Sequence, residues 1–313
     1  SELAAVSRYA AQRTSEEAAR QFQNKLVLGT DALERLRDRA IAPSDGLVCV
    51  TGATSGIGLE LGRVLTEMGY GVVLCGRDEH KLRRAKSELR GTVEIAQFDL
   101  SSLESTAEGA ARVAEEFDLS AVVLNAGTWP TVLDVTVDEL ELGLQTNHVA
   151  QALFLDRLLP LKSVLFVSSF AHAFCLSLDS LFEDPSFSRT TFDPNANYAA
   201  TKLTNVLYAK ELSRRGTRAV SAHPGFVSGT DLFENFPDFA TAVEVNVPDP
   251  LGLLSLPLYR GNDAVKLLES AAKAAIDSTP AWLPSPVKKP RQAARDLAAA
   301  LLDPSFTDGA YVA

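Results

Sequence analysis

A tyrosine and a lysine four positions apart, Tyr198 and Lys202, are the residues best suited to chemistry in this chain of 313 residues. They begin a segment rich in helix formers, and residues at i and i+4 share one helix face, so both side chains can point into one cleft. Because a nearby ammonium favours phenolate, we expect Lys202 to lower the pKa of Tyr198 from its ordinary value of about 10. Such a phenol can protonate a carbonyl oxygen while a hydride reaches the carbonyl carbon, or accept the proton in the reverse reaction. Taken alone, however, a Tyr-x-x-x-Lys spacing is usually a surface pair.

Two further polar positions precede this pair along the chain. Ser169 follows an apolar run, Ser163–Ser168, that is expected to form a buried strand, and its hydroxyl could hold the substrate oxygen. Asn147 lies in the helical segment before that strand, where we expect it to fix a water that connects Lys202 to solvent. The alternative interpretation is that Asn147 is a polar residue that bends its helix.

A glycine-rich segment, Thr51–Gly58, joins a predicted strand to a predicted helix. Glycine allows a sharp turn and a close approach of phosphate to the backbone, and the helix start offers N–H donors and the positive end of its dipole. In this strand–loop–helix context, the segment predicts a dinucleotide pyrophosphate site. The expected contacts are Gly52, Ser55, Gly56, Ile57 and Gly58.

The residues after the second predicted strand favour NADP(H) over NAD(H). An acidic side chain there would accept hydrogen bonds from the adenosine ribose and repel a 2′-phosphate. Gly76 stands in that place, and the neighbouring Arg77 offers a planar group suited to phosphate. Asp99 and Leu100 follow the third strand and are expected to bracket the adenine. After the fourth strand, small residues would let the backbone pass beside the cofactor, namely Asn125, Ala126 and Gly127.

Short apolar runs alternate with helical patterns from Gly46 onward. Uninterrupted apolar runs indicate strands covered on both faces, so the chain is expected to form an α/β fold, a doubly wound parallel sheet with helices on both faces. Its ligand crevice would lie at the carboxyl ends of the strands, where the strand order reverses. The expected strands are Leu47–Thr51, Gly71–Cys75, Thr92–Gln97, Ala121–Leu124, Ser163–Ser168 and Arg218–Ala222, and the expected helices cover about 57–69, 78–89, 102–116, 136–160 and 196–214.

These motifs resemble, in order, those of the short-chain dehydrogenase/reductase family. The matching residues are Thr51–Gly58, Asn125–Gly127, Asn147, Ser169, Tyr198, Lys202 and His223–Gly225. The resemblance implies a Rossmann-type fold, a nicotinamide cofactor and a catalytic set of Asn147, Ser169, Tyr198 and Lys202, with Lys202 also bound to the nicotinamide ribose. It further implies a homodimer or homotetramer. By the same resemblance, the nicotinamide end would be lined by Pro224, Gly225, Val227 and Thr230.

Three short sequence segments are similar to those of the retinol-dehydrogenase-like branch of this family, which includes the WW-domain-containing oxidoreductase. They are Asn147–Val149, Val167–His172 and Lys202–Leu207. This branch implies NADP(H) and apolar aldehydes, ketones or alcohols such as retinoids and steroids. Protochlorophyllide reductases share Asn147-His148 and the His-Pro-Gly turn, but less of their pattern is present.

The remaining segments define the expected domain organisation. Residues 1–44 predict an N-terminal extension of two amphipathic helices, and residues 45–313 a single NADP-binding oxidoreductase domain. The apolar segment 231–288 is expected to cover the substrate end of the crevice. A dimer contact and a membrane-surface patch are the other interpretations of this segment. Ala293–Leu302 predicts a last packing helix, followed by a closing strand.

Composition limits the function classes. A net charge of −10 and a pI near 5.0 argue against nucleic acid or an anionic membrane as the main partner. The three cysteines have no disulfide or zinc-site spacing, which suits reduced thiols in the cytoplasm, and no histidine has metal-ligand spacing. No apolar run reaches the roughly 18 residues of a spanning helix, so we expect a soluble protein.

The sequence therefore predicts an NADP(H)-dependent oxidoreductase that transfers a hydride to or from a carbonyl or alcohol of a hydrophobic small molecule. Two alternatives stay open. One is a nucleotide-sensing interaction module that uses the N-terminal helices as its contact surface. The other is a protochlorophyllide-reductase-like reductase of a conjugated ring.

Overall fold

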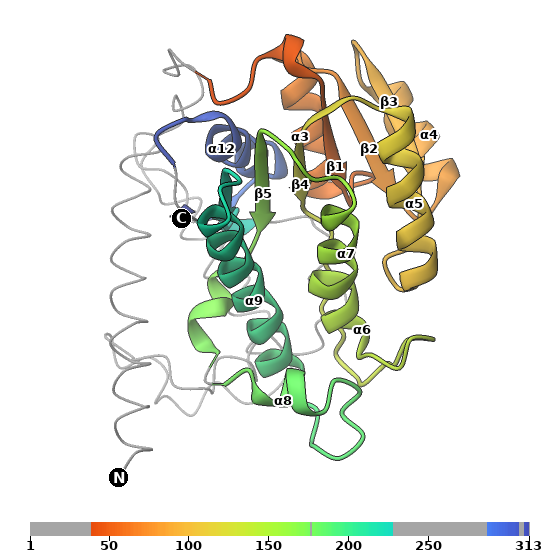
Figure 1. The fold of residues 1–313 in the computed structure, drawn as a ribbon, viewed down its shortest axis with the longest axis vertical. Coiled ribbons are helices and arrows are strands. Elements are labelled where there is room, and N and C mark those ends of the chain that lie inside the picture. Colours follow the sequence, from red (N-terminus) through yellow and green to blue (C-terminus); the bar gives the residue numbers. More distant parts are fainter. Residues whose placement is uncertain (1–38, 176, 228–286, 307–309, 313) are drawn as a thin grey trace.

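The computed structural model of the chain describes residues 39–175, 177–227, 287–306 and 310–312 (Figure 1). The two predicted N-terminal helices, the 231–288 segment and Thr230 lie outside these residues. None of the described helices combines the length and the apolar character needed to cross a membrane.

Seven parallel strands form the main sheet, in the order β3-β2-β1-β4-β5-β6-β9. The expected doubly wound parallel sheet is thereby confirmed, and six of its strands lie within two residues of their expected bounds. The strands are β1 Leu47–Thr51, β2 Val72–Gly76, β3 Val93–Gln97, β4 Leu119–Leu124, β5 Ser163–Val167, β6 Ala219–Ala222 and β9 Tyr311–Val312. A separate parallel pair joins β7 Phe226–Val227 to β8 Val287–Lys288.

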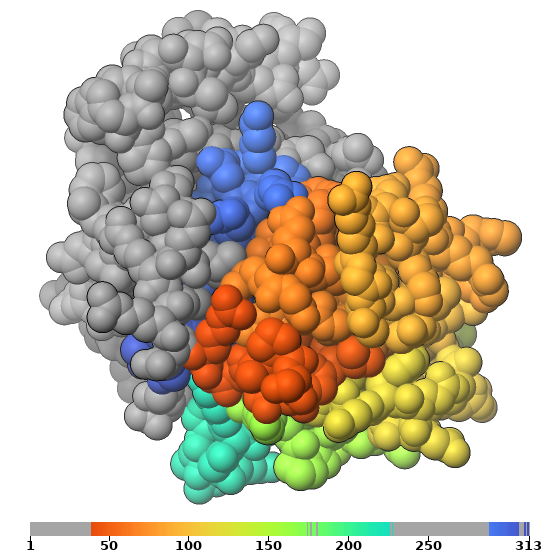
Figure 2. Space-filling view, turned by 90° about the horizontal axis from the view of Figure 1, so that it is seen from above, coloured from red at the N-terminus to blue at the C-terminus, as the bar shows by residue number. Residues whose placement is uncertain are grey.

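Helices cover both faces of this sheet. Helices α3 and α12 pack against each other on one face, where their surfaces adjoin in orange and blue in Figure 2. Helices α5, α7 and α9 pack on the other face, with α7 and α9 in front of the sheet in Figure 1. The longer helices are α3 Gly56–Glu67, α4 Glu79–Glu88, α5 Leu103–Glu116, α7 Ala150–Asp156, α9 Pro194–Arg214 and α12 Pro290–Leu302.

Alternate residues of each strand point to the two faces, which explains the apolar runs in the sequence. In β1, Val48 and Val50 belong to the core on the α3 side, whereas Cys49 belongs to the core on the α7 side. Cys49 and Cys75 are both fully buried there, and their sulfur atoms lie 3.2 Å apart. Both cysteines are therefore core thiols.

Two segments differ from the sequence expectations. The predicted helix over 136–160 begins later, with the short α6 Leu142–Leu144, a π-helical turn η2 Gln145–Val149 and then α7. Its start is set by Glu141, whose carboxylate accepts hydrogen bonds from the amides of Gly143 and Leu144 at 2.8 and 2.6 Å. No helix was expected between residues 160 and 196, but the structure has a short one there, α8 Asp179–Glu183.

β1 pairs with both β2 and β4, so the chain winds outward in opposite directions from this point. Loops that follow β1 and β4 therefore leave the sheet on opposite sides and create a crevice at its carboxyl edge. The predicted site residues lie at this edge or on the helices beside it.

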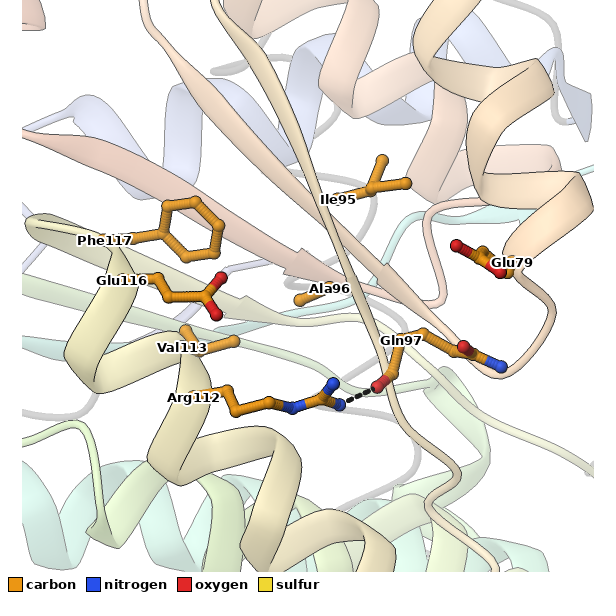
Figure 3. A pocket seen from close by; sticks show the side chains of 8 residues that line it. All are labelled: Glu79, Ile95, Ala96, Gln97, Arg112, Val113, Glu116 and Phe117. Atoms are coloured by element: carbon orange, nitrogen blue, oxygen red, sulfur yellow. Dashed lines mark hydrogen bonds between the residues drawn. The ribbon is translucent and has the colours of Figure 1, made fainter.

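A small hollow of about 160 Å³ lies elsewhere, beside the edge strand β3 (Figure 3). Arg112 of α5 reaches across it and donates to the carbonyl of Gln97. Three strands separate β3 from β5, the strand that precedes Ser169, so this hollow is not part of the crevice.

Candidate active site

Tyr198 and Lys202 lie one turn apart near the start of α9, and both are buried, with Tyr198 only 4% exposed. Asp193 caps this helix by accepting hydrogen bonds from the amides of Asn195 and Ala196. The Lys202 ammonium donates to the Val167 carbonyl at the end of β5, at 3.2 Å. The helical face predicted from the sequence therefore turns inward, toward the carboxyl edge of the sheet.

The expected effect of Lys202 on the Tyr198 pKa is wrong for this structure. Burial raises the pKa of Tyr198 to about 12, and a hydrogen bond from the Ser169 side chain opposes this only in part. Lys202 Nζ lies 5.5 Å from the centre of the phenol ring, over its face. Burial also lowers the pKa of Lys202, to about 8. Loss of solvation is the main cause of both shifts, so Tyr198 keeps its proton at neutral pH.

The two serines after β5 have different partners. Ser169 forms the hydrogen bond to Tyr198, and its hydroxyl oxygen also accepts from the Ala171 amide at 3.2 Å. Ser168 donates to the Lys202 carbonyl at 2.8 Å and fixes α9 against the sheet. Ser169 is thus the serine that the structure brings together with the phenol.

Asn147 lies in the π-helical turn, fully buried. Its side chain accepts from the Thr128 amide at 2.7 Å and donates to the Thr128 carbonyl and the Thr201 hydroxyl at 2.9 and 3.1 Å. These bonds hold the loop after β4 against α9. The π turn fits the alternative interpretation, in which Asn147 belongs to a bend in its helix, and the water-relay role stays a prediction.

A buried glutamine connects the three segments around the crevice. Gln151 donates to the carbonyls of Ala126 and Asn147 at 2.9 and 3.0 Å, and its side-chain oxygen accepts from the Thr51 hydroxyl at 2.9 Å. The Thr51 hydroxyl in turn accepts from the amides of Asn125 and Ala126. This network ties the glycine-rich loop, the end of β4 and the bent helix together.

The glycine-rich loop has the geometry expected of a phosphate cradle. Gly52 has a φ of +64°, and a Cβ atom on Gly58 would lie 2.3 Å from the Gly52 carbonyl oxygen, so neither position accepts a side chain without a shift. Asn125 donates from its side chain to the carbonyls of Thr51 and Gly52 and holds the loop. Ser55 is exposed at the start of α3, where the first N–H groups of a helix have no partner within it. A dinucleotide pyrophosphate fits this cradle.

Residues 46–171 match the model of the short chain dehydrogenase family. Over these residues the chain is similar to the short chain dehydrogenases. Retinol dehydrogenase 13 of Homo sapiens is 33% identical over 201 residues, which are 59% of this chain and 60% of that protein. The WW domain-containing oxidoreductase of Pongo abelii is 32% identical over 216 residues, 63% of this chain and 52% of that protein. The resemblance to the retinol-dehydrogenase-like branch is confirmed, although the chain spans less than two thirds of these curated relatives.

Solved structures agree on the fold. A protein from Mycobacterium paratuberculosis is 31% identical, with a TM-score of 0.52 over 61% of this chain and 74% of that chain. A blue fluorescent protein from a metagenomic library, solved with NADPH, has a TM-score of 0.56 at 18% identity, over 87% of this chain and 97% of that chain. At such low identity the second likeness shows the family's fold alone.

The other positions predicted from the family pattern lie around the same edge. Arg77 is exposed directly after β2, and its carbonyl accepts from the side chain of Gln97. The Asp99 carboxylate already accepts from the amide and hydroxyl of Ser101, which fixes the loop after β3, while Leu100 is buried. Gly127 is exposed, and a Cβ atom there would lie 3.1 Å from Lys202 Nζ.

The turn after β6 is the last predicted part of the family's site. The Gly225 amide donates to His223 Nδ1 at 3.0 Å, and Gly225 has a φ of +82°. Pro224 is half-buried, and Val227 is buried where β7 pairs with β8. The turn thus leads from β6 toward Lys288, the partner of Val227 in that pair.

Sequence reasoning missed two residues that the structure brings to this family's site. One is Gln151, whose contact with Thr51 spans 100 positions in the chain. The other is Trp129, whose indole ring stacks on the Tyr198 phenol with ring centres 4.1 Å apart. A large aromatic two positions after the Asn-Ala-Gly run was a usable signal for Trp129, whereas a glutamine on a helix gives no comparable signal.

Proposed function

We propose that this chain is an NADP(H)-dependent oxidoreductase that transfers a hydride to or from a carbonyl or alcohol of a hydrophobic small molecule. The observation that carries the proposal is the buried group of Tyr198, Ser169 and Lys202 at the carboxyl edge of the sheet. The match of residues 46–171 to the short chain dehydrogenase model and the relatives named as retinol dehydrogenases support it.

The residues present fit a bound dinucleotide. In the proposed complex, the pyrophosphate would lie on Gly52, Ser55, Gly56, Ile57 and Gly58, and the adenine near Asp99 and Leu100. Along the strand edge, the backbone would pass Asn125, Ala126 and Gly127, and the nicotinamide end would meet Pro224, Gly225, Val227 and Thr230. When bound, the nicotinamide would supply or accept the hydride.

Tyr198 would act as the acid in carbonyl reduction. Because the pKa of its phenol is about 12, the hydroxyl holds a proton at neutral pH that it can pass to the substrate oxygen. The Ser169 hydroxyl, which already bonds the phenol, would accept or donate to the same oxygen and orient it. Lys202 would place a positive charge beside the phenol and favour the phenolate left after proton transfer. Asn147 would hold the segment that Lys202 packs against.

The preference for NADP(H) rests on the end of β2. Arg77 is exposed there. The preceding residue is Gly76, so no carboxylate at that position would repel a 2′-phosphate. A guanidinium at this position can pair with a 2′-phosphate through two hydrogen bonds. The substrate class rests on the relatives' names and on the apolar 231–288 segment of the sequence.

The deciding experiment measures NADPH oxidation by the full chain against a panel of apolar aldehydes and ketones, with NADH as the cofactor control. We expect Tyr198→Phe to lower turnover at least about 100-fold, since general acid catalysis contributes on that order. Tyr208→Phe is the matched control, because Tyr208 lies on the same helix but donates to Asp156 away from the site. Near wild-type turnover in Tyr198→Phe would remove the proposed acid. Tight NADPH binding without turnover on any substrate would favour the nucleotide-sensing alternative.

A further inference from the structure

Trp129 contacts helix α9 at two places. Its indole ring lies nearly parallel to the Tyr198 phenol, with an angle of 5° between the planes and 4.1 Å between the ring centres. Its indole N–H donates to the Pro194 carbonyl in the first turn of the same helix, at 3.1 Å. The loop after β4 is therefore held to α9 at the residue that carries the phenol and one turn before it.

The stack does two things to the phenol. Parallel aromatic rings attract each other, so the indole restricts rotation of the Tyr198 ring about its own axis. The indole also excludes water from that face of the ring. Trp129 is itself only half-buried, whereas Tyr198 is 4% exposed. Removing the indole would therefore open the phenol to solvent rather than leave a closed cavity.

We propose that Trp129 is a positioning residue for Tyr198, which holds the phenol in one plane and shields it from water. The effect of this role on turnover rests on the proposed function. The stack and the shielding do not, so they can be tested without a substrate.

The remaining groups around the phenol do not replace this shield. Ser169 reaches it from the end of β5, and Lys202 lies over its ring from the same helix. His172, in the 3-10 turn Phe170–Phe174, contacts the Ser169 carbonyl at 2.7 Å. The Glu141 carboxylate, directly before α6, accepts a hydrogen bond from the side chain of Asn197, the residue before Tyr198. Burial is the main cause of the raised pKa of Tyr198, so loss of the indole should move that pKa down toward its ordinary value.

The first experiment measures ionisation of Tyr198 by phenolate absorbance at 295 nm, with the Tyr198→Phe background subtracted. At pH 11, a pKa of about 12 leaves about a tenth of the phenol ionised in the wild type. We expect about half to be ionised in Trp129→Ala, with a native far-UV circular dichroism spectrum. Val137→Ala is the matched control on the same loop, since Val137 is 85% exposed, and it should behave as the wild type.

The second experiment separates positioning from cofactor binding. We expect Trp129→Ala to lower kcat about tenfold, with the KM for NADPH unchanged. Trp129→Phe keeps a flat ring and should recover most of the lost kcat. A merely structural role would lower the amount of folded protein and leave the kcat of the folded molecules unchanged.

The outcomes are distinct. An unchanged ionised fraction together with an unchanged kcat in Trp129→Ala overturns the proposal. If Trp129→Ala does not fold, Trp129→Leu keeps the apolar volume without a flat face, and the same two results decide. If the wild type reduces no substrate in the panel, the proposed function fails while the phenol titration still supports or overturns the stack.

Discussion

Gln151 offers the sharpest test of how the crevice is held together. Its side chain is 2% exposed and makes three hydrogen bonds of 2.9–3.0 Å, to the Thr51 hydroxyl and to the carbonyls of Ala126 and Asn147. Gln151→Met keeps nearly the same length and volume but removes all three bonds. The partners then stay buried with fewer or no hydrogen bonds.

The magnitude follows from the number of groups affected. A buried polar group that loses its partner costs about 1–3 kcal/mol. Thr51 keeps the two amides that donate to its hydroxyl, and the Asn147 carbonyl keeps the Asn205 amide at 3.1 Å. The loss is therefore partial at two of the three groups, and we expect the free energy of unfolding to fall by about 3 kcal/mol.

Urea unfolding followed by circular dichroism measures this change. Gln97→Met is the matched control, because Gln97 is exposed and donates one bond to the Arg77 carbonyl. Its stability should stay within about 0.5 kcal/mol of the wild type. A loss below about 1 kcal/mol in Gln151→Met would refute the reasoning, since the network would then contribute no more than a single surface contact.

Three further predictions concern the cofactor and the buried ammonium. Burial lowers the pKa of Lys202 from 10.5 to about 8, so its charge destabilises the fold at pH 7. Lys202→Met should raise the free energy of unfolding at pH 7 by about 2 kcal/mol while abolishing turnover. This gain should shrink as the pH rises from about 8 to about 10.5, because over this range the wild-type lysine is neutral in the folded protein and still charged in the unfolded chain. A variant less stable than the wild type at pH 7 would contradict this. Gly58→Ala places a Cβ atom 2.3 Å from the Gly52 carbonyl oxygen, so NADPH affinity measured by cofactor fluorescence should fall more than about tenfold with the secondary structure retained. Arg77→Ala should weaken NADPH binding about tenfold and leave NADH binding unchanged; equal losses for both cofactors would remove Arg77 from the 2′-phosphate.

Local sequence patterns were sufficient to predict the strands of the sheet. They were insufficient to predict the π turn between α6 and α7. The strands could be predicted because most are runs of buried β-branched and apolar residues, such as Val72–Leu74, between polar turns. The stretch 136–160 is rich in apolar residues on both sides of the polar run Gln145–His148, so it was predicted as one helix. The π turn at Gln145–Val149 and the cap at Glu141 were therefore not anticipated.

The site residues likewise fall into those that local patterns could pair and those that they could not. Tyr198 and Lys202 could be paired from spacing because both lie on one helix. Trp129 reaches Tyr198 from another segment, and the raised pKa of Tyr198 comes from burial that no local pattern contains. Contacts between distant segments, and the solvation that they remove, are therefore the part of the chemistry that the sequence did not disclose.

The two core thiols, Cys49 and Cys75, can report on opening of the core beside the sheet. Cys49 and Cys75 lie on adjacent strands directly beneath the glycine-rich loop and the end of β2, and neither is exposed. Thiol reagents attack the thiolate, and burial raises the pKa of Cys75 well above its ordinary value. An alkylating reagent can therefore modify this pair only in molecules in which the core on the α7 face of the sheet has opened. The labelling rate measures how often that opening occurs, and a bound dinucleotide that bridges the two strand ends would slow it.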